Sequence, residues 1–196
     1  RNSGEFYRWN ESTTEFEGQS RFETATLTYS TISWGTAFTK QGAEYQSEIF
    51  QNLLDNRNNV SQLVGANNSN SSQLTPNGFY SGYSGTQQDV VLGSFMTAYN
   101  NTQGNSRNID PLQNTPLPNW SINYSGLTKY KFTKKVLKSF IVRHAYSSSV
   151  SVSGMQTNLN SSVDENGNIN SVDIDNNYIP EMQIQNVVLS ERFSPL

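Results

Sequence analysis

The stretch that decides the fold class is Ser139-Phe140-Ile141-Val142-Arg143-His144-Ala145-Tyr146-Ser147-Ser148-Ser149-Val150-Ser151-Val152-Ser153, in which apolar and polar residues alternate. Such alternation predicts a β-strand with one apolar and one polar face. The apolar face carries Phe140, Val142, His144, Tyr146, Val150 and Val152, with Ser148 as a polar exception. At ~3.3 Å per residue the strand spans roughly 50 Å, whereas ~9–11 residues suffice to cross a membrane. The length favours a barrel strand that projects beyond the bilayer; a long edge hairpin of a soluble sandwich is the alternative.

Shorter alternations predict further strands at 24–29, 120–124 and 181–191. The first of them changes phase near Ser30-Thr31, which indicates a bulge or tight turn. Between the long strand and the last one, Asn166-Gly167 predicts an exposed two-residue hairpin turn. We find no internal repeat in the sequence.

Helical spacing replaces the alternation over residues 44–64, where apolar residues recur along one stripe. Gly65 predicts the end of this helix. A second, shorter helix is predicted from Asp89, as its N-cap, to Tyr99. Loops are predicted at 66–86 and 100–118, and irregular structure at 1–19.

The composition limits the classes of function. Only 15% of the residues are charged and 34% are hydrophobic, a balance typical of surface-exposed β-structure and of barrels that are wet on one face. A net charge of −3 excludes a broad basic surface for nucleic acid. The absence of cysteine excludes disulfides and thiolate metal sites. No apolar run approaches the ~20 residues of a membrane helix, so any contact with a bilayer core would be made by barrel strands.

The sequence predicts no catalytic, cofactor-binding or metal-binding residue. The single histidine, His144, lies on the apolar face of the long strand, so we interpret it as packed or hydrogen-bonded rather than as part of a Ser-His-Asp site. Two acidic stretches, Asp164-x-Asn166-Gly167-Asn168 and Asp173-x-Asp175-x-Asn177, lack the glycine and glutamate spacing of an EF-hand and are interpreted as solvated loops. Glu44 and Glu48 are interpreted as a solvated helix face rather than a glycosidase pair.

A basic run lies between the predicted strand at 120–124 and the long strand. It comprises Lys129, Lys131, Lys134, Lys135 and Lys138. One interpretation is an interfacial anchor at anionic lipid. The other, which we favour slightly, is a charged hairpin end that keeps the chain soluble.

The stretch Pro116-Leu117-Pro118-Asn119-Trp120-Ser121-Ile122-Asn123-Tyr124-Ser125-Gly126-Leu127 resembles a signature of the SprA/Sov family, the outer-membrane translocon of the type 9 secretion system of Bacteroidetes. In that family a strand with Ser-Phe and then His-x-Tyr follows, which Ser139-Phe140 and His144-Ala145-Tyr146 match. Weaker matches are Phe50-x-x-x-Leu54-x-x-Arg57, Ser61-x-Leu63, Gln88-Asp89-Val90, Phe95-x-x-Ala98-Tyr99, Ile179-Pro180-Glu181 and Glu191-x-Phe193-Ser194-Pro195-Leu196. The resemblance covers residues 47–196 and departs from the family pattern by an Asn- and Ser-rich insertion at 66–75.

This resemblance implies a mainly β chain, namely a segment of a very large antiparallel outer-membrane β-barrel with two short helices in an inserted loop region. The helices would lie outside the barrel wall or inside the pore. The expected parts are strands and an irregular lead-in at 1–43, a helical and loop insertion at 44–118, and long barrel-type strands with an exposed hairpin at 119–196. We expect a fragment or processed product, because the chain begins at Arg1 and ends in mid-pattern at Leu196.

The function that the resemblance implies is a protein-conducting channel that exports folded cargo and supports gliding motility. Its partners would be secreted cargo proteins, a PorV-like shuttle protein, a periplasmic plug protein and outer-membrane lipid, with no cofactor and no enzymatic activity. A second hypothesis is a soluble β-domain of a cell-surface adhesin or glycan-binding module, which would use exposed aromatics such as Trp9, Trp34 and Tyr83. A third is a hydrolase that uses His144.

Overall fold

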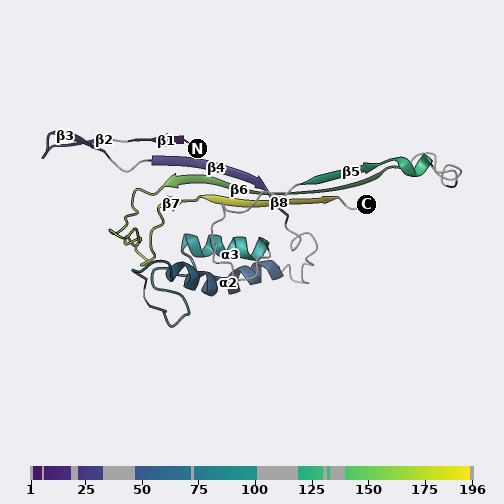
Figure 1. Ribbon diagram of the computed structural model, residues 1–196. Coiled ribbons are helices and arrows are strands. Elements are labelled where there is room, and N and C mark those ends of the chain that lie inside the picture. Colours follow the sequence, from purple (N-terminus) through teal and green to yellow (C-terminus); the bar gives the residue numbers. More distant parts are fainter. Residues whose placement is uncertain are drawn as a thin grey trace.

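The computed structural model describes residues 2–5, 7–18, 22–32, 47–71, 73–100, 119–129, 132 and 140–194. The fold is mainly β: an antiparallel sheet lies above two stacked helices (Figure 1). A separate hairpin of β2 (Tyr7–Asn10) and β3 (Glu15–Gly18) projects beyond one end of the sheet. This hairpin and β1 (Asn2–Gly4) show that the irregular structure predicted for residues 1–19 was wrong. Within the described ranges, neither helix is long and apolar enough to cross a membrane.

The strand β6 (Val142–Thr157) is the centre of the sheet. On one side it pairs with β7 (Met182–Gln183) and β8 (Asn186–Ser194). On the other side two strands share its edge end to end: β4 (Phe22–Ser30) pairs with its C-terminal half, and β5 (Trp120–Tyr124) pairs with its first residues. The long strand predicted from the sequence is confirmed, although it begins at Val142 and continues to Thr157.

The register divides the side chains of the sheet into two faces, because directly paired residues of antiparallel strands point the same way. The apolar face carries Leu27, Tyr29, Trp120, Ile122, Tyr124, Val142, His144, Tyr146, Val150, Val152, Val187, Leu189 and Phe193, with Ser148 and Glu191 as its polar members. The polar face carries Thr28, Ser30, Ser121, Asn123, Arg143, Ser147, Ser149, Ser151, Ser190 and Arg192, with Ala145 and Val188 as its apolar members. The alternation predicted for β6 is therefore confirmed.

A β-bulge interrupts this alternation near the end of β6. Ser153 and Gly154 together lie opposite Thr26, and the φ angle of Gly154 is 66°. The extra residue brings Met155 onto the apolar face, where it is buried. This bulge is a different feature from the change of phase predicted near Ser30-Thr31: β4 ends at Ser30, and residues 33–46 lie outside the described part of the chain.

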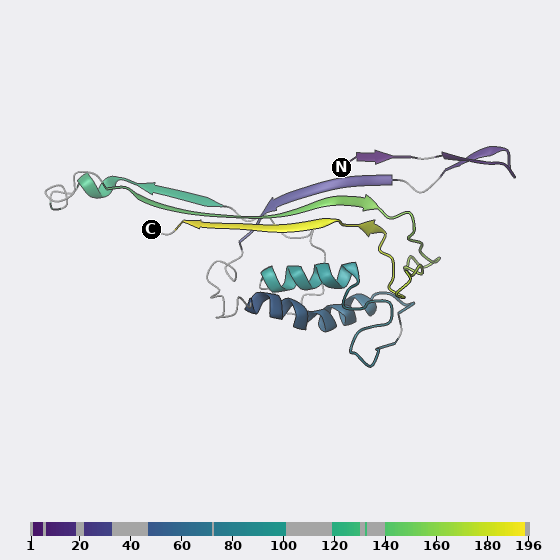
Figure 2. The ribbon, with the colours of Figure 1, turned by 180° about the vertical axis from the view of Figure 1, so that it is seen from behind.

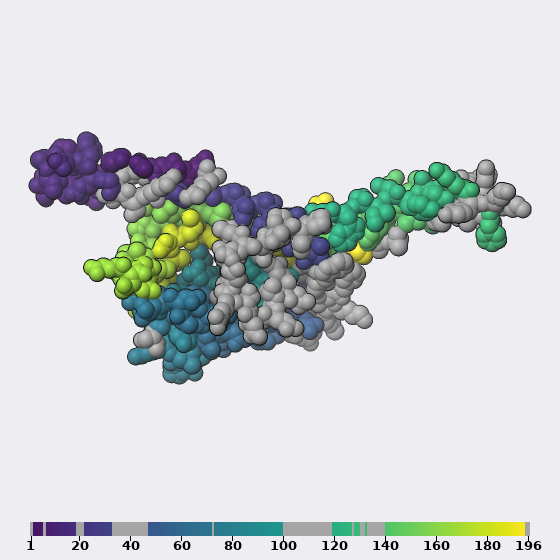
Figure 3. Space-filling model, in the orientation of Figure 1, coloured from purple at the N-terminus to yellow at the C-terminus, as the bar shows by residue number. Residues whose placement is uncertain are grey.

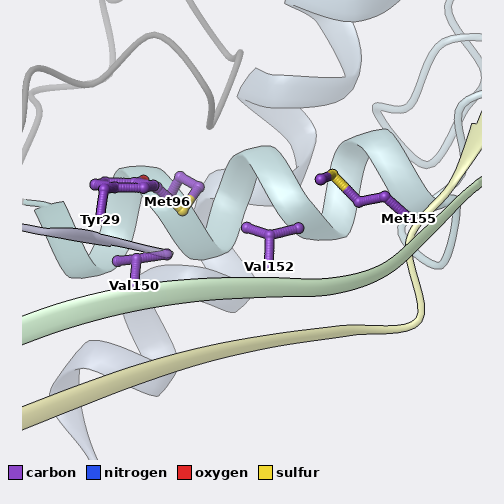
Figure 4. Close-up of a cluster of buried hydrophobic side chains, with 5 residues drawn as sticks. All are labelled: Tyr29, Met96, Val150, Val152 and Met155. Carbon is purple, nitrogen blue, oxygen red and sulfur yellow. The ribbon is translucent and has the colours of Figure 1, made fainter. Parts of the chain in front are cut away.

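Two helices cover one half of the apolar face. The helix α3 (Gln88–Asn100) packs directly on the sheet, and α2 (Glu48–Gly65) lies on the far side of α3 (Figures 1 and 2). The core between sheet and α3 consists of Tyr29, Met96, Val150, Val152 and Met155 (Figure 4). The end of the sheet that contains β5 extends beyond both helices.

The ends of the helices are fixed by side chains. The Ser47 hydroxyl accepts a hydrogen bond from the backbone of α2, and this helix ends at Gly65 as predicted. At the start of α3, the Gln87 side-chain oxygen accepts hydrogen bonds from the N–H groups of Asp89, at 2.6 Å, and Val90, at 3.1 Å. Asp89 thus lies in the first turn of α3, and its predicted N-cap role was wrong.

A second glutamine attaches α3 to the edge of the sheet. The ladder between β6 and its neighbour is interrupted between Gln183 and Asn186. There the Gln88 side chain donates to the Met182 carbonyl at 2.8 Å and accepts from the Ile184 N–H at 2.9 Å. The amide of Gln88 thus satisfies backbone groups that the sheet leaves unpaired at this point.

Three nine-residue hairpins of one design lie beside the helices, at 73–81, 162–170 and 171–179. In each, the third residue exchanges backbone hydrogen bonds with the sixth and the seventh, and the sixth has a positive φ angle: Gly78 at 83°, Gly167 at 81° and Asn176 at 59°. The sequence therefore does contain an internal repeat, contrary to our expectation. The turn at Asn166-Gly167 is not the predicted two-residue turn, which would need a positive φ at both residues.

The hairpins and the 66–86 segment form one packed unit rather than solvated loops. Tyr83 and Tyr178 pack together, with ring centroids 5.2 Å apart. The Tyr178 hydroxyl donates to the Asn70 carbonyl at 2.7 Å, and the side-chain oxygen of buried Asn177 accepts from the Ser84 N–H at 3.1 Å. The prediction that 173–177 is too polar to be buried is confirmed for 173–176, which are exposed, and was wrong only for Asn177, which satisfies a backbone group inside the unit.

Candidate functional site

A row of aromatic side chains crosses the sheet where β5, β6 and β8 meet. Trp120 lies directly opposite Tyr146 on one side, and Phe193 lies opposite it on the other. The rings of Trp120 and Tyr146 stack, with centroids 4.7 Å apart and planes inclined by 24°. His144 lies next to this row, with its ring 5.4 Å from that of Phe193 in an edge-to-face arrangement. The row belongs to the apolar face, just beyond the part that α3 covers.

Polar groups within the row are hydrogen-bonded. The hydroxyl of buried Tyr146 donates to a carboxylate oxygen of Glu191 at 2.7 Å. A ring nitrogen of His144, Nδ1, lies 3.1 Å from the backbone oxygen of Ser194. These bonds fix both rings in place, because each joins a side chain of β6 to β8.

The end-to-end junction of β4 and β5 lies next to the aromatic row, at Ser148. Just after the end of β4, the Thr31 N–H donates a hydrogen bond to the Ser148 carbonyl of β6, at 3.1 Å. The Ser148 N–H donates to the side-chain oxygen of Asn119, at 2.9 Å. Asn119 therefore continues the hydrogen-bond ladder across the gap between the two strands. The buried Ser148 hydroxyl has no hydrogen-bond partner among the described residues.

Replacing Asn119 by alanine is expected to destabilise this junction by about 1–2 kcal/mol, because the Ser148 N–H loses its acceptor. Hydrogen exchange of the Ser148 amide should accelerate. Asn119→Asp keeps an acceptor oxygen and should leave the exchange rate close to that of the unaltered protein. Equal exchange rates in the alanine and aspartate variants would contradict this role.

The structure brings together three separate motifs of the sequence. Asn119-Trp120, His144-x-Tyr146 and Glu191-x-Phe193-Ser194 all meet at the aromatic row. In the sequence these motifs are separate, and nothing in it predicts that they touch. The bond between Tyr146 and Glu191 could not be predicted either, because strand register depends on pairing partners that alternation alone does not identify.

The interpretation of His144 as a packed, hydrogen-bonded residue is confirmed. Among the described residues its ring contacts a backbone carbonyl and the rings of Trp120 and Phe193. A Ser-His-Asp site would need a serine hydroxyl on one ring nitrogen and a carboxylate on the other. The recorded contacts of His144 do not form that arrangement.

The acidic loops use their carboxylates to shape the hairpin turns. One Asp164 oxygen accepts from the N–H groups of Asn166 and Asn168, both at 2.9 Å, and the other accepts from the Asn70 side chain at 2.9 Å. The Asn168 N–H and the Asn70 amide lower the pKa of Asp164. Asp173 repeats the two backbone bonds. In the described part of the chain, no group of three or more His, Cys, Asp or Glu side chains could hold a metal ion.

The other residues singled out in the sequence are spread over the molecule. Glu48 is exposed in the first turn of α2, as predicted. Trp9 is 48% exposed on the β2–β3 hairpin, whereas Tyr83 is only 2% exposed, so its predicted exposure was wrong. Glu44, Trp34 and all lysines of the basic run except Lys129 lie outside the described residues.

No protein-family model matches the sequence, and no curated protein is found to be similar to it. The geometry of the sheet and the motifs that meet at the aromatic row are therefore the observations that bear on function.

Proposed function

We propose that this chain is part of an outer-membrane protein-conducting channel that exports folded cargo proteins, of the kind formed by the SprA/Sov family in type 9 secretion. The proposal locates the protein in the cell outer membrane. Its partners would be secreted cargo, a PorV-like shuttle protein, a periplasmic plug protein and the lipid around the barrel. The proposed role is passive conduction, which also underlies gliding motility.

The observation that carries this proposal is the separation of the two faces along β6. This strand has 16 residues, and its neighbours β5 and β8 keep the same separation of apolar and polar side chains, except at Val188 and Glu191 of β8. A barrel wall requires this pattern, with an apolar surface toward lipid and a polar surface toward the lumen. The serine-rich polar face would then line the conduit, where small hydroxyl groups offer no strong binding site to a passing polypeptide.

The position of the helices agrees with such a wall. Because α3 packs on the apolar face, α2 and α3 would lie on the outer side of the barrel rather than in its lumen. The half of the sheet beneath α3 has no apolar surface left for lipid, so it would stand beyond the bilayer. This arrangement agrees with an insertion outside the barrel wall, which was one of two places expected from the sequence.

The resemblance at residues 116–127 supports the same function. Several of the weaker matching residues also make specific contacts. The buried Ser61 hydroxyl donates to the Tyr83 carbonyl at 2.6 Å, and an Arg57 guanidinium nitrogen donates to the Gly85 carbonyl at 3.2 Å. Residues that fix the packing of a fold are those that a shared fold would retain, so these contacts support the proposal.

The channel proposal predicts that cells without this protein, at its native length, retain cargo proteins in the periplasm instead of releasing them into the medium. The measurement is the amount of cargo in the two fractions, with the restored gene as the control. The purified protein should also need detergent to stay dispersed. Unchanged release from the deleted strain, or a detergent-free monomer in buffer, would overturn the proposal.

One observation favours glycan binding as the second candidate function. The β2–β3 hairpin exposes Trp9, Tyr7 at 62% and Phe16 at 67% on one of its faces. Exposed aromatic rings suit stacking against a sugar. Loss of binding to immobilised glycans in the Trp9→Ala variant, with unchanged cargo export, would favour this function over the channel.

A further inference from the structure

An apolar groove of ≈ 330 Å³ lies between the start of β8 and the helical layer. Its apolar lining comes from both sides and comprises Leu53, Val91, Leu92, Phe95, Ile184 and Val187. Figure 3 shows the yellow C-terminal segment at the surface of the molecule, above the teal helical layer. We infer that this groove holds one further β-strand, from the part of the native-length protein outside residues 1–196, which pairs with β8 and is covered by α2 and α3.

This inference rests on the proposed channel function and adds a specific contact to it. A closed barrel wall leaves no strand edge unpaired, so β8 needs a neighbour there. That requirement alone does not say what the neighbour touches besides β8. In the inferred arrangement its apolar side chains pack beneath the helices, so that α2 and α3 fasten two adjacent strands of the wall to each other.

The direction of the backbone groups in β6 is fixed at Ser148. Its N–H bonds to the side chain of Asn119 and its carbonyl accepts from Thr31, so both groups point toward β4 and β5. Backbone groups of successive residues in a strand point to opposite sides. Those of Ser149 and Ser151 therefore point toward β8.

The same alternation leaves backbone groups of β8 pointing away from the sheet. Val188 and Ser190 lie opposite the two serines that point toward β8, so their backbone groups bond to β6. The N–H and carbonyl groups of Val187 and Leu189 then point outward, and among the described residues they have no hydrogen-bond partner. A β-strand is the element that pairs with such an edge. A lipid chain or a small apolar molecule has no backbone to offer these groups.

The groove also defines the chemistry of the strand that it would hold. A paired strand lies ~4.8 Å from its neighbour, and its residue opposite Val187 would point, like Val187, toward α3. The amide of Gln88 in the groove is already bonded to the Met182 carbonyl and the Ile184 N–H. The strand therefore meets a mainly apolar surface, and we expect apolar residues at alternate positions along it.

The groove is continuous with the core between the sheet and α3. Leu92, Phe95, Ile184 and Val187 pack against the buried cluster of Figure 4 and also line the groove. A strand added to β8 would thus extend an existing core by one row. The channel proposal sets this half of the sheet beyond the bilayer, so acyl chains would not reach the groove.

The first test is photochemical cross-linking in the native-length protein. A benzophenone side chain replaces Leu53, which lines the groove from α2. The matched control carries the same group in place of Phe50, which is 53% exposed on α2 and does not line the groove. Val91 provides a second position in the groove if replacement of Leu53 disturbs folding. Mass spectrometry identifies the cross-linked peptides after irradiation.

The second test is hydrogen exchange at single amides of the unaltered native-length protein. The Val188 N–H points toward β6 and serves as the internal reference, whereas the Leu189 N–H points outward. If a strand pairs with β8, the Leu189 amide should exchange within about tenfold of the rate of Val188, because both are held in ladders. An unpaired Leu189 amide should exchange much faster than that of Val188.

The expected cross-link joins position 53 to a segment of the same polypeptide outside residues 1–196 that carries apolar residues at alternate positions. Position 50 should not give this product. A cross-link to another protein or to phospholipid, no cross-link at either groove position, or fast exchange of Leu189 would each overturn the inference. Any of these results with restored cargo export would leave the channel proposal intact. The expected results together with unchanged export in the deleted strain would overturn the channel proposal alone.

Discussion

Replacing Gly82 by alanine is expected to lower the free energy of unfolding by about 2–5 kcal/mol. The φ angle of Gly82 is 81°, a conformation that costs an L-residue energy. A Cβ atom at this position would clash with Cδ2 in the ring of Tyr178. The Gly82 carbonyl also accepts from the Tyr178 N–H at 2.8 Å, so the clash would separate the hairpins from the helical segment.

The matched control for this prediction is Gly167→Ala. Gly167 has the same φ angle of 81°, but a Cβ atom there would meet nothing within 4 Å. Its replacement should cost only the left-handed conformation, about 1–2 kcal/mol. The measurement is denaturant-induced unfolding of both variants, followed by tyrosine fluorescence. Equal losses in the two variants would show that the contact between Gly82 and Tyr178 contributes nothing.

The second large effect is expected for Gln87→Ala, which should destabilise the protein by about 2–4 kcal/mol. The side chain is 3% exposed and makes four hydrogen bonds. Its oxygen caps α3 through the N–H groups of Asp89 and Val90. Its nitrogen donates to the Tyr178 carbonyl at 3.1 Å and to the Asp89 carboxylate at 3.0 Å. Alanine would leave these groups without their partner.

Gln87→Glu separates the contribution of the capping oxygen from that of the donor nitrogen. It keeps the capping oxygen and replaces the donor by a second carboxylate beside Asp89, whose pKa is raised by burial. A carboxyl group whose pKa is higher in the folded than in the unfolded protein stabilises the folded state at a pH below its unfolded-state pKa. This stabilisation is lost as the pH rises through its folded-state pKa. The glutamate variant should therefore recover stability on acidification, as measured by thermal unfolding at several pH values. A pH-independent loss would contradict this account.

Strands and helices could be predicted from the sequence where burial of one face makes apolar residues recur at regular spacing. Val150 and Val152 alternate with serines because α3 covers one face of β6, and this pattern is visible without a structure. Helix α2 likewise ends at Gly65, where glycine disfavours continuation. Local preference and tertiary packing agree at these positions, so the prediction succeeds.

The parts that were missed depend on contacts between distant segments. Asp89 resembles a cap in sequence, but the longer Gln87 side chain reaches the same N–H groups and also the Tyr178 carbonyl. The bulge at Gly154 was not predicted, because β4 alternation alone does not reveal an extra residue in its partner. The repeat at 162–179 escaped notice because its turn positions are filled by different residues, Gly167 and Asn176, that share one conformation.

The aromatic row could be predicted in composition but not in geometry. Trp120 and Tyr146 each belong to an alternating stretch, so their placement on an apolar face followed from the sequence. Their direct pairing, and the bond from Tyr146 to Glu191, required the register of three strands. A shift of one residue would have turned each side chain to the opposite face.

The end-to-end junction at Ser148 has a mechanical consequence for the sheet. Among the residues that the structure describes, only the pairing of β6 with β8 continues without interruption past this point, because β4 ends at Ser30 and β5 begins at Trp120. The sheet is thus narrowest there, and a single amide side chain, that of Asn119, links its two halves along that edge. A load on the tip would flex the sheet about this line, as about a hinge, before it strained the core around Val152.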